Sequence, residues 1–320
     1  MTEKTKRKLD FKSVVNIVKL TAKGFSDDNV TKLSASLAYA TLFSLVPFLS
    51  LVISIGALFK MDIGSQVYNA LDIILGETVV ENLQTIITNA SMSRSSTWAT
   101  IVSLGVTIFG ATAIFAEMQS SLNFIWGIKP KPKKGWLKYI INRVLSFSLI
   151  IAFAFLMLVT FFLTGLINGL KDKLIILYPD ITAILFQIIG FMLNITIITF
   201  IFMLIFKTLP DAKIKFRDVF VGSLVTTVLF MLGQYAISIY LQTRDTESVY
   251  GAAAFILLLL LWIYYSSIIV YIGAEFTESW ANEMGSKIYP DEYAVTTQII
   301  EVQKDDQPVE TINKVEVDKT

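Results

Sequence analysis

The chain has 320 residues, of which 54% are hydrophobic and 17% are charged, and its formal net charge at pH 7 is +1. A soluble domain of this length needs no such apolar excess, so the composition indicates that a lipid bilayer is the solvent. The chain has no Cys and no His, which excludes disulfides, thiol nucleophiles and thiolate or imidazole metal ligands. Any catalysis would need carboxylates, Lys, Ser or Tyr, and no nucleophile is accompanied by a recognisable base. We expect no metal, no cofactor and no enzymatic activity.

Residues 1–32 form a basic segment that we expect to remain in the cytoplasm. Its lysines and arginines accompany no apolar run comparable to the core of a signal peptide, so no cleaved leader is expected. Between residues 11 and 25 apolar residues recur at helical spacing, with lysines on the remaining face, which predicts an amphipathic helix. Two arrangements fit this helix: it lies on the anionic membrane surface, or it packs against the rest of the protein.

Six apolar stretches follow, each long enough to cross the roughly 30 Å hydrocarbon core of a bilayer. The predicted fold class is all-α: a polytopic membrane protein with one bundle of six transmembrane helices over residues 33–280. The spans are predicted at 33–59, 98–124, 140–168, 181–207, 216–241 and 250–277.

The distribution of basic residues predicts the orientation of these spans. Of the 27 Lys and Arg residues, twenty-two lie before the first span, in the second and fourth connections with the adjoining helix ends, or after the last span. Because basic residues are enriched on the cytoplasmic side of short connections, both termini are expected in the cytoplasm.

The first outer connection and the tail differ from the other segments between spans. Residues 60–97 are too many for a turn and carry apolar positions near helical spacing, which predicts two short amphipathic helices over the outer end of the bundle. Residues 281–320 are polar and acidic and hold too little apolar material for a core of their own. We expect them to form a mobile cytoplasmic tail.

Pro47 in the first span lacks an amide hydrogen and obstructs the carbonyl of Phe43, so a kink is expected near the middle of the membrane. Small residues at Ser36, Ala40 and Ser44 recur every four positions and favour close approach of another helix. A broken helix is typical of transporter sites, but a purely structural kink fits the same sequence.

Glu117 is the most deeply placed ionisable residue, about 10 Å inside the cytoplasmic end of the second span. An ionised carboxylate in hydrocarbon needs a cation, so we predict an ion pair with Arg143 at the start of the third span. Glu275 lies at a similar depth in the last span and competes for the same cation. Two carboxylates sharing one arginine either form a structural cluster or bind a proton reversibly, as a proton-coupled carrier requires.

The sequence resembles the YihY/BrkB family of bacterial inner-membrane proteins from about residue 25 to residue 280. The resemblance is carried by LAYATLFSLVP at residues 37–47, SLNFIWG at residues 121–127, and Tyr250-Gly251 followed by Trp262, Tyr264 and Gly273-Ala274-Glu275. Residues of these motifs, Tyr39, Asn123, Trp126 and Trp262, join Pro47 and the three charged residues as candidate transport or structural residues. Family members commonly have a second Tyr where this chain has Ala40.

The resemblance implies a place in the bacterial inner membrane and a link to envelope integrity or lipid transport. The leading hypothesis is a transporter or flippase-like protein for a lipid or another envelope component. The alternative is a scaffold that organises envelope machinery without transporting anything. Membrane lipids are the expected partners, and envelope proteins or a second copy of the chain also fit. No nucleic acid is expected, because no soluble domain is present to hold RNA, which sets aside an older description of the family as ribonucleases.

Overall fold

The computed structural model of this protein describes residues 10–58, 63–75, 77–92, 97–131, 135–174, 179–242 and 254–297. Most of these residues are helical. The helices are α1 (Phe11–Asp27), α2 (Val30–Leu58), α3 (Ile63–Leu75), α4 (Glu77–Met92), α5 (Thr97–Ile125), α6 (Gly135–Leu174), α7 (Pro179–Thr208), α8 (Phe216–Gln242) and α10 (Ala254–Glu283). Four short strands complete the described part: β1 (Ile128–Pro130), β2 (Ala212–Lys213), β3 (Tyr289–Pro290) and β4 (Ala294–Thr296).

Six long helices, α2, α5, α6, α7, α8 and α10, occupy the six stretches in which spans were predicted. Among the described residues, α2, α7, α8 and α10 each contain a segment long and apolar enough to cross a membrane. The largest difference in length is in α6, whose 40 residues extend beyond the predicted span at both ends. At 1.5 Å per residue α6 is about 60 Å long, so it must tilt steeply or project from a bilayer.

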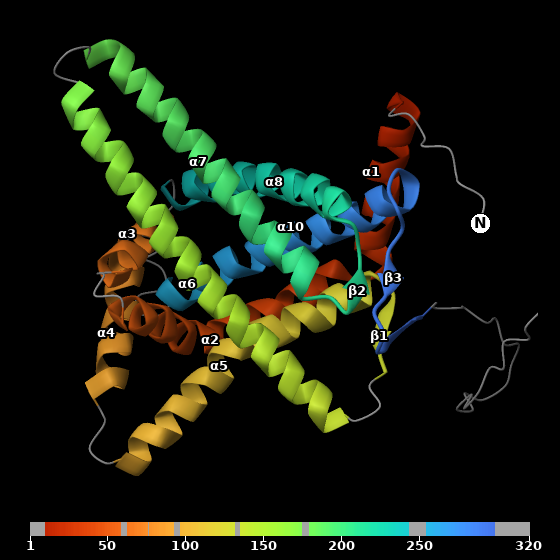
Figure 1. Cartoon of the computed structure of the whole chain (residues 1–320), viewed down its shortest axis with the longest axis horizontal. Coiled ribbons are helices and arrows are strands. Elements are labelled where there is room, and N and C mark those ends of the chain that lie inside the picture. Colours follow the sequence, from red (N-terminus) through yellow and green to blue (C-terminus); the bar gives the residue numbers. More distant parts are fainter. Residues whose placement is uncertain are drawn as a thin grey trace, which may run out of the picture.

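The long helices are arranged in contacting pairs rather than in one even ring. α2 packs along α5 and also contacts α10, while α8 packs between α10 and α7. In Figure 1 the four strands lie at one end of this bundle, here called the strand end, and α3 and α4 lie at the opposite end. The helices α6 and α7 run diagonally away from the other helices toward their connection (Figure 1).

The strand end joins three connections that are far apart in the sequence. β1, which follows α5, pairs antiparallel with β4, and β2, which follows α7, pairs antiparallel with β3. Both β3 and β4 follow α10, in a segment where the sequence predicted a mobile tail. Residues 281–297 are therefore folded, because they supply backbone partners to two loops; residues 298–320 lie outside the described part.

The predicted helix between residues 11 and 25 is present as α1, and it packs against α10. Ile17 and Thr21 are buried on its inner face, whereas Phe11 and Val18 remain exposed. Asn29, at a φ of 50°, makes the sharp turn from α1 into α2, a backbone conformation that Asn tolerates better than most residues. The two helices predicted between residues 60 and 97 are also present, as α3 and α4.

Close approach of α8 and α10 depends on glycines that receive side chains from the opposite helix. A Cβ atom at Gly222 would collide with Thr277, and one at Gly273 would collide with Thr226. The two contacts are reciprocal, because each helix contributes one glycine and one threonine. In a bilayer, where apolar surfaces are already solvated by lipid, such close packing is a main source of helix association.

We predict that Gly222→Leu lowers the thermal stability of the purified protein, because the added side chain forces Thr277 and α10 outward. The expected loss is about 1–3 kcal/mol, the usual cost of overpacking a close contact. Thermal unfolding in detergent measures this loss. Gly105→Leu is the matched control, since no atom lies within 4 Å of a Cβ at Gly105; an equal loss in both variants would contradict the prediction.

Candidate functional site

Glu117 lies on α5, about two turns before the helix ends at Ile125. The hydroxyl of Ser36 on α2 donates a hydrogen bond of 2.6 Å to its Oε1 atom. This contact uses one of the small residues that the sequence assigned to close helix packing. The side chain of Arg143 lies outside the described residues, so the ion pair between Glu117 and Arg143 stays a prediction.

Asn123, two residues before the end of α5, binds the connection that follows α7. Its Nδ2 donates to Asp211 Oδ2 at 3.0 Å, and the backbone N–H of Asp211 donates to Asn123 Oδ1 at 2.8 Å. Both side chains are buried. Since the carbonyl of Asp211 also accepts from the N–H of Asp291, this pair ties α5, the loop after α7 and the segment after α10 together.

Trp126 connects two of the sequence motifs that carry the family resemblance. The indole is 4% exposed, and its Nε1 donates a hydrogen bond of 3.2 Å to the carbonyl of Ala274 on α10. Asn123 and Trp126 therefore both act at the strand end, each through a hydrogen bond to another element. Buried hydrogen-bond donors need an acceptor, and both Asn123 and Trp126 find theirs on another part of the chain.

Glu275 is 2% exposed and lies where α10 meets α1. Its carboxylate packs against Gly24, where a Cβ atom would collide with it. Burial raises the pKa of Asp28, at the α1–α2 junction, with a smaller increase from the charge of Asp27; a hydrogen bond with Glu275 opposes both effects. Glu117 and Glu275 thus contact different helices, α2 and α1, at the strand end.

The other candidate residues are spread over the bundle. Pro47 packs against Gly110 of α5, and α2 remains a single continuous helix through it. Trp262 packs edge-on against Phe230, with ring centroids 6.4 Å apart. Tyr39 is 65% exposed and lies beside Phe43 on the outer surface of α2. The structure therefore does not bring Pro47, Trp262 and Tyr39 together with the two glutamates.

A groove of about 580 Å³ lies between α6 and α7. It starts at Lys171, one turn before α6 ends at Leu174, and continues to Thr160, about 16 Å further along the helix. The groove is therefore in the half of the helices that is remote from the strand end. Its walls combine apolar and polar groups: Thr160, Thr164, Ile167, Lys171, Phe186, Gln187, Gly190, Leu193, Asn194 and Ile197.

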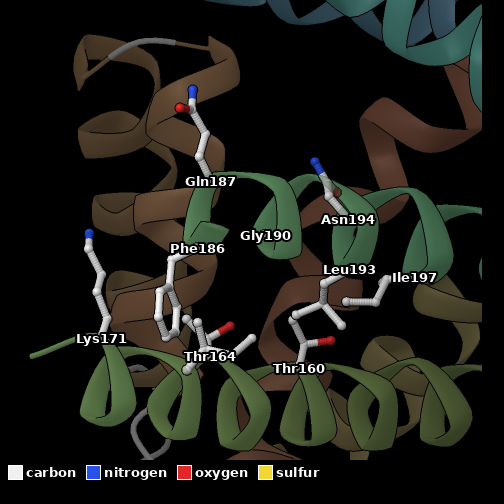
Figure 2. A pocket seen from close by; sticks show the side chains of 10 residues that line it. Thr160, Thr164, Lys171, Phe186, Gln187, Gly190, Leu193, Asn194 and Ile197 are labelled. Atoms are coloured by element: carbon white, nitrogen blue, oxygen red, sulfur yellow. The ribbon is translucent and has the colours of Figure 1, made fainter. Parts of the chain in front are cut away.

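Figure 2 shows how these side chains are arranged. Phe186, Leu193 and Ile197 of α7 point toward the threonines of α6, while Gln187 and Asn194 lie at the rim on the other side of α7. No hydrogen bond joins Gln187 or Asn194 to another residue of the described ranges. Gly190, between them, has no atom within 4 Å of a Cβ position. The groove thus offers an apolar floor, polar rim groups and a cation at one end.

Nothing in the sequence spacing of the amides Gln187 and Asn194 tells whether they bind other helices or line a cavity. Lys171 was not predicted as a site residue. Asp211 was not predicted as the partner of Asn123, since nothing in the spacing of residues 88 positions apart indicates that they meet. Antiparallel connection of α6 to α7 was predictable, but the rotation of each helix was not.

The long apolar helices, close glycine contacts and exposed apolar side chains define a polytopic α-helical membrane protein. The chain belongs to the virulence factor BrkB family, whose profile matches residues 21–294. This match confirms the resemblance inferred from the motifs.

Relatives of this chain include proteins named as membrane proteins. A UPF0761 membrane protein of Cronobacter sakazakii is 26% identical over 262 residues, which cover 78% of this chain and 83% of the relative. A UPF0761 membrane protein of Idiomarina loihiensis is 26% identical over 284 residues, which cover 84% of this chain and 92% of the relative. No solved structure matches the chain.

Asn123→Ala is predicted to destabilise the protein, because it leaves the buried N–H of Asp211 without this hydrogen-bond acceptor. Loss of a buried partner of this kind costs about 1–3 kcal/mol. The melting temperature in detergent should fall, and protease cleavage near the strand end should become faster. Asn194→Ala, at an exposed asparagine, is the matched control and should melt like the wild type; equal melting of the two variants would refute the assigned role of Asn123.

Proposed function

We propose that this protein is a six-span protein of the bacterial inner membrane that moves a lipid or another amphipathic envelope component. The groove between α6 and α7 carries this proposal, because it combines an apolar floor with polar groups and a cation at the end of a long helix. The pairing of the short strands supports the other part of the proposal, the six crossings of the membrane.

Strand pairing supports six crossings with both termini on one side. The pairs β1–β4 and β2–β3 hold the ends of α5, α7 and α10 in one layer. Since α2 starts beside α1, which packs on α10, the beginning of α2 belongs to the same layer. If α2, α7, α8 and α10 cross, then α5 must cross for β1 to reach β4, and α6 must cross for β2, after α7, to reach β3. The excess of basic residues in these connections favours a cytoplasmic position for this layer.

Cysteine labelling tests this topology without background, because the chain has no cysteine of its own. We expect Glu81→Cys, on α4, to react with an impermeant maleimide in intact spheroplasts. Lys131→Cys, just after β1, should react only after the membrane is permeabilised. Both positions are exposed. If residues 81 and 131 react from the same side, α5 does not cross and the six-span arrangement is wrong.

The groove fits a lipid-like ligand by length and by chemistry. Helix α7 has its span-forming segment at Ile184–Thr208, so Gln187 lies near one membrane surface and Asn194 about 10 Å deeper. Lys171 lies at the end of α6, where an anionic headgroup would find a cation. The apolar wall formed by Phe186, Leu193 and Ile197 suits an acyl chain. An amphipathic molecule therefore matches the groove better than a small polar solute.

Gly190→Phe is predicted to block transport while leaving the fold intact, because the added ring enters open space in the groove. Purified protein in liposomes should move fluorescent anionic lipid analogues between leaflets, as measured by dithionite quenching. We expect the rate in Gly190→Phe vesicles to approach that of empty vesicles. Gly105→Phe, at an equally open glycine of α5 that does not line the groove, should keep the wild-type rate.

A second variant tests the selectivity of the groove. Lys171→Gln should slow anionic analogues by about tenfold, the effect of losing one charge-assisted contact, and should leave a zwitterionic analogue nearly unchanged. Equal rates in wild-type, variant and protein-free vesicles would refute transport. That result would favour the alternative, a membrane scaffold.

A further inference from the structure

The geometry points to a second binding site, at the strand end, that takes an organic ammonium ion carrying an apolar group. This site is separate from the groove between α6 and α7 and does not depend on the transport proposal. It is a cavity of about 870 Å³ between α1, the end of α5 and the end of α10. A cavity of this size suits a small organic molecule rather than a single ion.

Acidic groups dominate the lining of this cavity. Asp27 and Asp28 reach it from the α1–α2 junction, and Glu275 and Glu278 reach it from α10. Lys23 is the only basic side chain among the lining residues. No ion pair between Lys23 and any of the four carboxyl groups occurs within the described part of the chain. Four carboxyl groups beside one lysine give the cavity an excess of acidic groups that favours a cation.

One of the two carboxyl oxygens of Glu275 lacks a partner. The residue is 2% exposed and its carboxyl group forms a hydrogen bond with Asp28, yet its Oε1 atom has no hydrogen-bond partner among the described residues. The Glu275 carboxyl group packs so closely on Gly24 that a side chain at position 24 would collide with it. A buried carboxyl oxygen without a donor is costly, because it loses its hydrogen bonds to water and that oxygen has no replacement. A ligand N–H group in the cavity would supply the missing donor.

Two observations favour an organic ammonium ion over a metal ion. The described residues contain no group of three or more carboxylates arranged to hold a metal. Phe124, which is 47% exposed, forms part of the cavity wall together with Leu20 and Ile125. An aromatic face beside carboxylates attracts an ammonium group, and the apolar wall accommodates its hydrocarbon part.

Binding of tritiated phenethylammonium to the full-length protein in non-ionic detergent tests this inference, with scintillation proximity as the readout. We expect saturable binding to the wild type and an affinity about tenfold lower for Glu275→Gln, which loses a charge-assisted contact. Phe124→Leu should weaken binding by about threefold through loss of the cation–π contact. Glu117→Gln is the matched control: it removes a carboxylate outside the cavity and should bind like the wild type.

A neutral competitor, two further variants and competition by Mg²⁺ complete the test. Neutral 2-phenylethanol should not compete, and Gly190→Phe, which fills the other groove, should bind normally. If Glu275→Gln does not fold, Asp27→Asn at the exposed rim should weaken binding by about threefold instead. Non-saturable binding to the wild type, or equal affinity in folded Glu275→Gln, would overturn the inference. Displacement by Mg²⁺ at lower concentration than by unlabelled phenethylammonium would also overturn it, in favour of an inorganic cation.

Discussion

The packing of this protein depends on three consecutive residues of α10 that contact three other parts of the chain. Gly273 receives Thr226 of α8, the carbonyl of Ala274 accepts the indole N–H of Trp126 just after α5, and Glu275 packs on Gly24 of α1. Successive residues of a helix point about 100° apart, so a triplet can reach neighbours on several sides. Each position has its own role: residue 273 has no side chain, the carbonyl of residue 274 accepts a hydrogen bond from outside its helix, and residue 275 carries a carboxyl group.

The strand end adds a second set of contacts between parts of the chain that are far apart in the sequence. β1–β4, β2–β3 and the pair Asn123–Asp211 hold the loops after α5, α7 and α10 against one another. In α6 and α7 the opposite halves lack such connections within the described residues, and Gly165, Gly169 and Gly190 there have no neighbour within 4 Å of a Cβ position. The molecule is thus tightly joined at one end and open between two helices at the other, which is where the groove forms.

Helix positions were predictable because a long apolar stretch in lipid has no alternative to helix, since every backbone group needs an internal partner. The contacts of individual residues were not. Ser36 was predicted only as a small residue for close packing, but its hydroxyl also donates a hydrogen bond to Glu117. The fold of residues 281–297 was missed because two- and three-residue strands form only when distant loops supply their partners. Such pairing leaves no periodic signal in the sequence.

The polar groups of the bundle include some with hydrogen-bond partners and some without among the described residues. Asn123, Asp211 and Trp126 have partners from other elements, and a satisfied buried network makes the packing specific and rigid. Gln187 and Asn194 have no hydrogen-bond partner among the described residues, although both lie in the helix that has the most apolar of the span-forming segments. An amide on a lipid-facing helix is costly unless water or a ligand satisfies it. Their position at the rim of an open groove therefore favours ligand binding over packing as their role.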